Sequence, residues 1–164
     1  MRTVVVVSGP VNAGKTTIGR ALARAIDGAT FIDGDDHDAP DDAPLHVRIE
    51  AALRRLCDEI VATPSLCLVI AYPLRDEDYE RLLLAARTRN ARLLVVTLAP
   101  PLEVTLGDRG NRKLEEEERA RIREMYAGGY HQPAFSGLTV AGTPSIDLAV
   151  RQILAWLDAL PTSP

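Results

Sequence analysis

The chain is poor in cysteine, and it contains no long apolar run. Its two cysteines, Cys57 and Cys67, have neither CxxC nor zinc-finger spacing. Each lies in an apolar stretch, so we expect two buried free thiols in a reducing cytoplasm. No run reaches the roughly 18 apolar residues of a membrane span. Residues 4–7 are too short for the apolar part of a signal peptide, so we expect a cytoplasmic protein without a membrane span.

An excess of positive charge is also missing. The chain has 23 acidic and 19 basic side chains, which gives a net charge of −4. This balance argues against broad binding to nucleic acid. The length of 164 residues is enough for one domain with a core, and no internal repeat or linker is visible. We therefore expect a single domain over residues 1–164, either a monomer or a homodimer.

Residues 9–16 read G-P-V-N-A-G-K-T and fit the P-loop pattern G-x-x-x-x-G-K-[ST]. A β-branched run precedes them at residues 3–7, and apolar residues at helical spacing follow them. A loop between a strand and a helix N-terminus can direct its backbone N–H groups at a phosphate. Lys15 would reach the β- and γ-phosphates, and the Thr16 hydroxyl would coordinate Mg²⁺. The predicted nucleotide-binding residues are Gly9, Asn12, Ala13, Gly14, Lys15, Thr16 and Thr17.

Apolar runs alternate with helical patterns along the whole chain. This alternation predicts an α/β fold in which a parallel sheet is covered by helices on both faces. In such sheets ligands bind beyond the carboxyl ends of the strands. The segments that follow the strands should therefore meet at one edge, where we expect the chemistry. The expected strands are residues 3–7, 29–32, 66–71, 93–98 and 138–140.

Asp33 and Asp35 lie two residues apart at the end of the second predicted strand. In extended chain such residues point to the same side. Beside a phosphate loop, one carboxylate can place Mg²⁺ and the other can orient an attacking hydroxyl or accept its proton. The alternative is a solvated acidic turn, and four further aspartates in this loop fit that alternative.

The phosphate loop together with F-I-D-G-D-D-H at residues 31–37 resembles the small P-loop kinases. This group includes gluconate, adenylylsulfate and shikimate kinases and chloramphenicol phosphotransferases. The resemblance implies a P-loop NTPase fold of three α/β/α layers, with a five-stranded parallel sheet in the order 2-3-1-4-5. It also implies a mobile lid at about residues 107–133, as in nucleoside monophosphate kinases, and ATP-dependent phosphorylation of a hydroxyl that faces Asp35. The third strand ends without a Walker-B aspartate, so Asp33 would place the metal.

The remaining candidates lie in the predicted lid and on the acceptor side. Arg109 and Arg112 belong to a glycine-containing basic loop, and either could close over the transferring phosphoryl group. The alternative is a solvated loop that pairs with the following glutamates. On the acceptor side, the candidates are His37, Tyr72 and Arg75. Arg75 could instead pair with Asp78 on a helix, and His37 could be an ordinary surface residue.

The sequence thus predicts an ATP- and Mg²⁺-dependent kinase that acts on a hydroxyl of a small metabolite or natural product. The predicted catalytic residues are Lys15, Asp35, Arg109 and Arg112, and the predicted metal ligands are Thr16 and Asp33. One alternative is a polynucleotide 5′-hydroxyl kinase, against which the acidic balance counts. Another is a nucleotide-binding regulatory module without turnover, which would not need an acid on the acceptor side.

Overall fold

A strand with four consecutive valines lies at the centre of the sheet. In the computed structural model of the chain, which describes residues 1–108 and 113–161, Val4 to Val7 are at most 1% exposed. Their side chains alternate between the two faces, with Val4 and Val6 in one core and Val5 and Val7 in the other. An all-apolar strand is what a sheet with helices on both faces requires.

The sheet has five parallel strands in the order β2-β3-β1-β4-β5, which confirms the predicted order and fold class. Each strand matches an apolar run of the sequence, with shifts of a few residues at the ends. β4 is the longest because two further residues before the apolar run and one after it also pair. The strands are β1 (Arg2–Ser8), β2 (Ala29–Asp33), β3 (Cys67–Ala71), β4 (Ala91–Ala99) and β5 (Leu138–Ala141).

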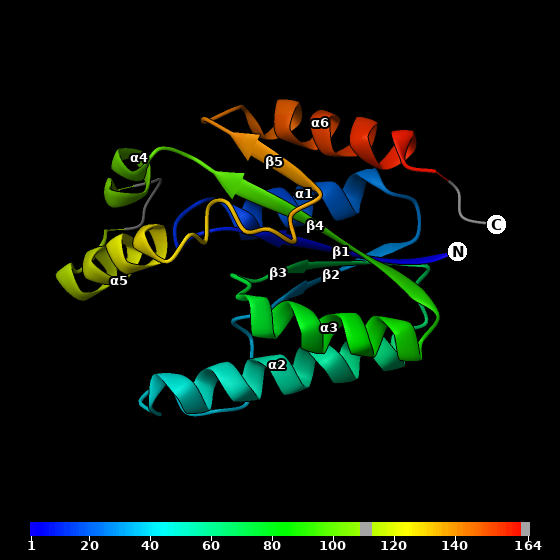
Figure 1. Ribbon diagram of the computed structural model, residues 1–164, viewed down its shortest axis with the longest axis horizontal. Helices are drawn as coiled ribbons and strands as arrows, with labels where there is room; N and C mark the ends of the chain where they lie inside the picture. The colour runs from blue at the N-terminus through cyan, green and yellow to red at the C-terminus, as the bar shows by residue number, and fades with distance from the viewer. Residues whose placement is uncertain (109–112, 162–164) are drawn as a thin grey trace.

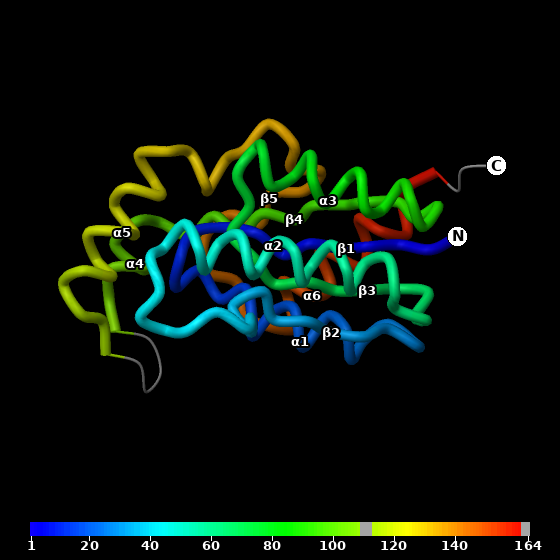
Figure 2. Tube along the Cα trace, turned by 90° about the horizontal axis from the view of Figure 1, so that it is seen from below, coloured from blue at the N-terminus to red at the C-terminus, as the bar shows by residue number. Residues whose placement is uncertain are grey.

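Two helices cover each face of the sheet, as Figure 1 shows. α1 (Lys15–Ala25) and α6 (Ile146–Ala159) lie on one face, and α2 (Leu45–Ala62) and α3 (Asp76–Thr88) lie on the other. α4 (Leu102–Leu106) and α5 (Glu116–Ala127) stand apart from these layers, beyond the carboxyl ends of the strands (Figures 1 and 2). The predicted lid contains α5, so this helix lies at the edge where the chemistry is expected.

The cysteines depart from expectation. Cys57 and Cys67 are both free, as predicted, but they are only partly buried. Each packs against one of the two cores, Cys57 from α2 and Cys67 from the start of β3. Burial still raises the pKa of each thiol. Among the described residues, no helix is both long and apolar enough to cross a membrane.

Arg89 joins the ends of two helices on the α2–α3 face. It follows α3, is only 7% exposed, and donates to the backbone oxygens of Ile60 at 3.0 Å and Ser65 at 2.6 Å. The Ile60 carbonyl belongs to the last turn of α2, which has no helical partner for its final carbonyls. The guanidinium therefore supplies hydrogen-bond donors to carbonyl groups at the C-terminal end of α2 and just beyond it.

Substituting Arg89→Met should keep the aliphatic stem but leave these two carbonyls without donors. Because hydrogen bonds to charged groups contribute about 1.5–3 kcal/mol each, we expect the free energy of unfolding to fall by about 2–4 kcal/mol. Urea denaturation followed by circular dichroism measures this. Arg87→Met on the exposed side of the same helix is the control and should change stability by less than about 0.5 kcal/mol. Equal effects of the two substitutions would contradict the assigned role.

Candidate functional site

The loop between β1 and α1 has a backbone that few residues can adopt. Gly9 has φ 138°, and a Cβ at this position would lie 2.5 Å from the Leu98 carbonyl oxygen. Asn12 and Gly14 also have positive φ, of 63° and 98°. These residues bend the chain so that α1 begins directly at Lys15. The free N–H groups of the first turn then face the space beyond the strands, where they can bind an anion.

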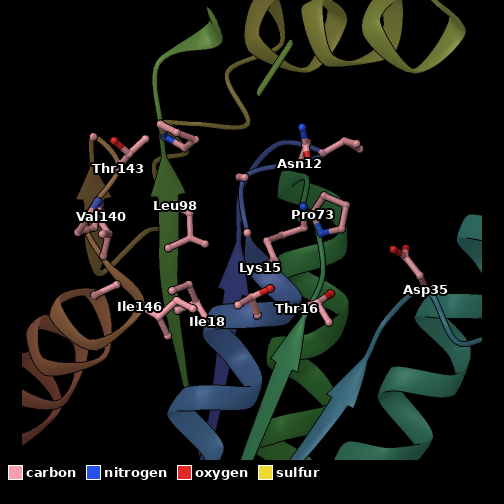
Figure 3. A pocket seen from close by; sticks show the side chains of 18 of the residues that line it. Asn12, Lys15, Thr16, Ile18, Asp35, Pro73, Leu98, Val140, Thr143 and Ile146 are labelled. Atoms are coloured by element: carbon pink, nitrogen blue, oxygen red, sulfur yellow. The ribbon is translucent and has the colours of Figure 1, made fainter. Parts of the chain in front are cut away.

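A cavity of about 580 Å³ opens beside this loop (Figure 3). Such a volume is typical of sites for small molecules. Six of its lining residues form one end, which is mostly apolar, in β5, the following loop and α6: Val140, Gly142, Thr143, Pro144, Ile146 and Ala149. The phosphate loop and the start of α1 form the middle, and Asp35 and Pro73 stand on the opposite side (Figure 3). The loops that follow all five strands thus contribute to one cavity.

Lys15 and Thr16 lie in the middle of the cavity. The Lys15 ammonium donates to the Pro10 carbonyl oxygen at 2.6 Å, so it curls back over its own loop. The Thr16 hydroxyl donates to the Asp33 carboxylate at 2.9 Å, which links the start of α1 to the end of β2. The structure therefore brings together the two residues that were predicted from the sequence as metal ligands.

These two oxygen-bearing side chains fit a magnesium ion that takes its other ligands from phosphates and water, the usual arrangement in phosphoryl-transfer sites. No cluster of three or more His, Cys, Asp or Glu side chains that could hold a metal occurs within residues 1–108 and 113–161. Thr16 and Asp33 are thus suited to a metal that arrives with a nucleotide, and they do not form a complete metal site by themselves.

Asp35 reaches the cavity because of a close contact at Gly34. The Gly34 N–H donates to the Ala71 carbonyl oxygen at 2.9 Å, and a Cβ on Gly34 would clash with this oxygen and with the Tyr72 ring. The Asp35 N–H donates to the Asp33 carboxylate at 3.1 Å. The two carboxylates therefore have different surroundings. Asp33 accepts hydrogen bonds from Thr16 and from the turn, whereas Asp35 is exposed and lines the cavity.

The other predicted acceptor-side residues lie next to the cavity but do not line it. Tyr72 is 5% exposed, and burial raises the pKa of its hydroxyl. The Arg75 guanidinium binds Asp78 through Nε at 3.0 Å and through a second nitrogen at 2.8 Å, so its predicted ion pair with Asp78 forms. His37 is partly buried, and its Nδ1 has no hydrogen-bond partner among the described residues.

Sequence reasoning missed two side chains and one contact. Glu118 and Arg121 line the cavity from α5. Charged residues occur all around α5, so the sequence gives no signal for the face that meets the cavity. Asn12 was predicted as a nucleotide-binding residue, but not as a contact of α4: its amide donates to the carbonyl oxygens of Thr105 at 2.9 Å and Gly107 at 3.2 Å. The predicted lid residues Arg109 and Arg112 lie outside the described residues.

No protein family matches the sequence, and no curated protein matches it either. Several solved structures share its fold. A gluconokinase from Sinorhizobium meliloti superposes with a TM-score of 0.74 at 18% identity, covering 96% of this chain and 91% of that one. Shikimate kinase from Acinetobacter baumannii, in complex with shikimate, gives 0.66 at 21% identity, with 98% and 97% covered. APS kinase from Mycobacterium tuberculosis, in complex with AMPPNP and APS, gives 0.66 at 17% identity, with 96% and 98% covered.

The Asn12 contacts generate a prediction about α4. Asn12→Asp should place a carboxylate against two carbonyl oxygens, while Asn12→Gly should remove the donor and keep the positive φ. We expect backbone amide exchange within residues 102–107 to be slowest in the wild type, faster in the Gly variant and fastest in the Asp variant. Hydrogen–deuterium exchange with mass spectrometry measures this, with α2 as the internal control. If the Asp variant protects α4 as well as the wild type, the amide does not hold this helix.

Proposed function

We propose that the chain is an ATP-dependent kinase that transfers the γ-phosphoryl group to a hydroxyl of a small molecule. The observation that carries this proposal is the position of Asp35. It stands across the cavity from the phosphate loop, beside a second carboxylate, Asp33, that is already bonded to the Thr16 hydroxyl. A protein that only binds a nucleotide needs the loop, but it does not need an exposed acid facing the end of the triphosphate.

The cavity offers a separate region for each part of the reaction. The mostly apolar end around Val140 and Ile146 suits a nucleobase, and the loop N–H groups with Lys15 suit the phosphates. Thr16 and Asp33 would hold Mg²⁺, which would offset negative charge on the phosphate oxygens. Arg121 lines the cavity from α5, so it can meet charge that spreads over the γ-phosphoryl oxygens.

Asp35 would orient the acceptor hydroxyl and take its proton as the new O–P bond forms. The bond between the γ-phosphorus and the bridging oxygen breaks, ADP leaves, and the proton passes from Asp35 to water. The structures with the same fold support a kinase, since they include a gluconokinase, a shikimate kinase and an APS kinase. Arg109 and Arg112 remain our candidates for further contacts with the phosphoryl group.

A polynucleotide acceptor fits the charges of this site less well. A strand of nucleic acid carries a phosphate at every step and needs a basic track. The loop that contains Asp35 has six aspartates and no lysine or arginine in residues 33–44. The first turn of α3 adds Asp76, Glu77 and Asp78. We therefore assign the acceptor to small molecules.

Lys15→Ala tests the phosphate side of the proposal. The loop backbone is built by glycine and asparagine conformations, so the fold should survive while a preorganised positive charge is lost. We expect kcat to fall by at least about 10²–10³-fold, the usual loss for one such donor. A radiolabel transfer assay measures this, and a thermal melt checks the fold. Arg24→Ala at the far end of α1 is the control. Unchanged transfer in the Lys15 variant would contradict the proposal.

Asp35→Asn and Asp33→Asn should have different defects. The first removes a base that typically contributes about 10²–10⁴-fold, so kcat should fall by roughly that factor while MgATP binding persists. The second weakens a metal ligand, so raising the Mg²⁺ concentration should restore part of the activity. Steady-state kinetics at several Mg²⁺ concentrations, with calorimetric titration of MgATP, separates the two. If Asp35→Asn transfers phosphate at the wild-type rate, Asp35 belongs only to an acidic turn.

A further inference from the structure

The side of the cavity formed by Asp35 and Pro73 is where the proposed reaction would receive its acceptor. Pro73 belongs to the turn between β3 and α3, and Tyr72 and Arg75 flank it. We call Asp35, Tyr72, Pro73 and Arg75 the acceptor corner; of these four, Asp35 and Pro73 line the cavity itself. The net charge of this corner decides whether an anionic or a cationic acceptor binds there more favourably.

Arg75 is the described guanidinium nearest to Pro73 in sequence, and two carboxylates already neutralise it. Asp78, which is 1% exposed, binds it by two hydrogen bonds and also accepts from the Arg75 backbone N–H at 3.0 Å. Glu77 lies 2.5 Å from its remaining terminal nitrogen. One positive and two negative charges leave this group net negative. An acceptor carboxylate or phosphate would have to displace Glu77 to bind here.

Two arginines of α2, Arg54 and Arg55, pair with carboxylates of the acidic loop, whereas Arg48 donates to the Ala43 carbonyl oxygen at 3.1 Å. Arg55 donates to the backbone oxygens of Asp33 and Asp36 and lies 3.5 Å from the Asp36 carboxylate. Arg54 lies 4.0 Å from the carboxylate of Asp38. Asp35, by contrast, forms no ion pair with the described residues, so its charge remains available to the acceptor.

The other part of the cavity carries two cationic side chains. Lys15 lies on the phosphate loop, and α5 contributes Arg121 together with the carboxylate of Glu118. A bound triphosphate carries about four negative charges near neutral pH, however, and would engage both cations. With nucleotide in place, the acceptor would therefore meet a surface whose net charge is negative.

We infer that the acceptor of the proposed kinase is a neutral or positively charged polyol, such as an amino sugar or an aminocyclitol, and not a sugar acid or a phosphorylated metabolite. This inference rests on the proposed function. The transfer converts the polyol hydroxyl and ATP into a phosphate monoester, ADP and one proton. Asp35 attracts a cationic acceptor as well as taking that proton, because unlike charges a few ångströms apart attract each other.

The test uses a small-molecule extract of the cells that encode the chain, separated by ion exchange at pH 7 into cationic, neutral and anionic fractions. Each fraction is incubated with the full-length protein, Mg²⁺ and γ-labelled ATP, and label in organic phosphate is counted. We expect label in the cationic or neutral fraction. Label confined to the anionic fraction would overturn the inference and leave the kinase assignment standing. If no fraction is labelled although MgATP binds, the proposed function itself fails, and the inference fails with it.

Two matched variants separate a specific role of the corner from net charge. Glu77→Gln removes one of the two carboxylates on Arg75 and leaves the buried Asp78 in place. Glu80→Gln removes the same charge from an exposed site on the same helix. We expect Glu77→Gln to raise the share of label in the anionic fraction by about 3- to 10-fold, which corresponds to roughly 1 kcal/mol. Glu80→Gln should keep the wild-type distribution, and equal distributions in both variants would overturn the role of Arg75 and Glu77.

Discussion

The hydrogen bond from the Thr16 hydroxyl to the Asp33 carboxylate connects the parts of this structure on which any chemistry depends. Its two residues come from α1 and from the end of β2, although β3 lies between β2 and β1 in the sheet. The bond can form because α1 crosses the sheet face above β3 and β2, and because β2 and β3 end at the same level, with Asp33 paired to Ala71. The strand order therefore places a carboxylate beside the phosphate loop.

Positive and negative groups lie in different parts of the cavity, and this separation suits the different ligands that we propose for each part. Lys15 and the backbone N–H groups of the phosphate loop occupy the middle, where phosphates would lie. Asp35 lines the other side, and beyond the cavity Glu77 and Asp78 neutralise Arg75. Because Glu77 and Asp78 engage Arg75, this guanidinium does not neutralise Asp35, which has no ion pair with residues 1–108 and 113–161. A negative acceptor side also repels the free phosphates and other anions that are abundant in cells. In the proposed kinase, this arrangement would favour transfer to an acceptor hydroxyl over occupation of the site by anions.

The fold and the phosphate site could be predicted from the sequence because both depend on local patterns. Apolar runs mark the strands, and the G-P-V-N-A-G-K-T loop specifies its own backbone. Asp33 and Asp35 could be predicted because they directly follow a strand. The roles of Arg121 and of the Asn12 amide could not, because they depend on how α4 and α5 sit over the strand ends. For Arg75 the sequence left two partners open, an anionic acceptor or Asp78. The hydrogen bonds in the structure show the pair with Asp78.

We propose above all that this protein transfers phosphate from ATP to a carbon-bound hydroxyl of a small molecule. Phosphorus NMR of the wild-type protein with MgATP and the unfractionated extract tests it most directly, because it follows every phosphorus atom at once. The account predicts that the γ-phosphate resonance declines while a phosphomonoester resonance and ADP grow in equal amounts. Growth of inorganic phosphate alone, or no change over hours at high protein concentration, would contradict the account.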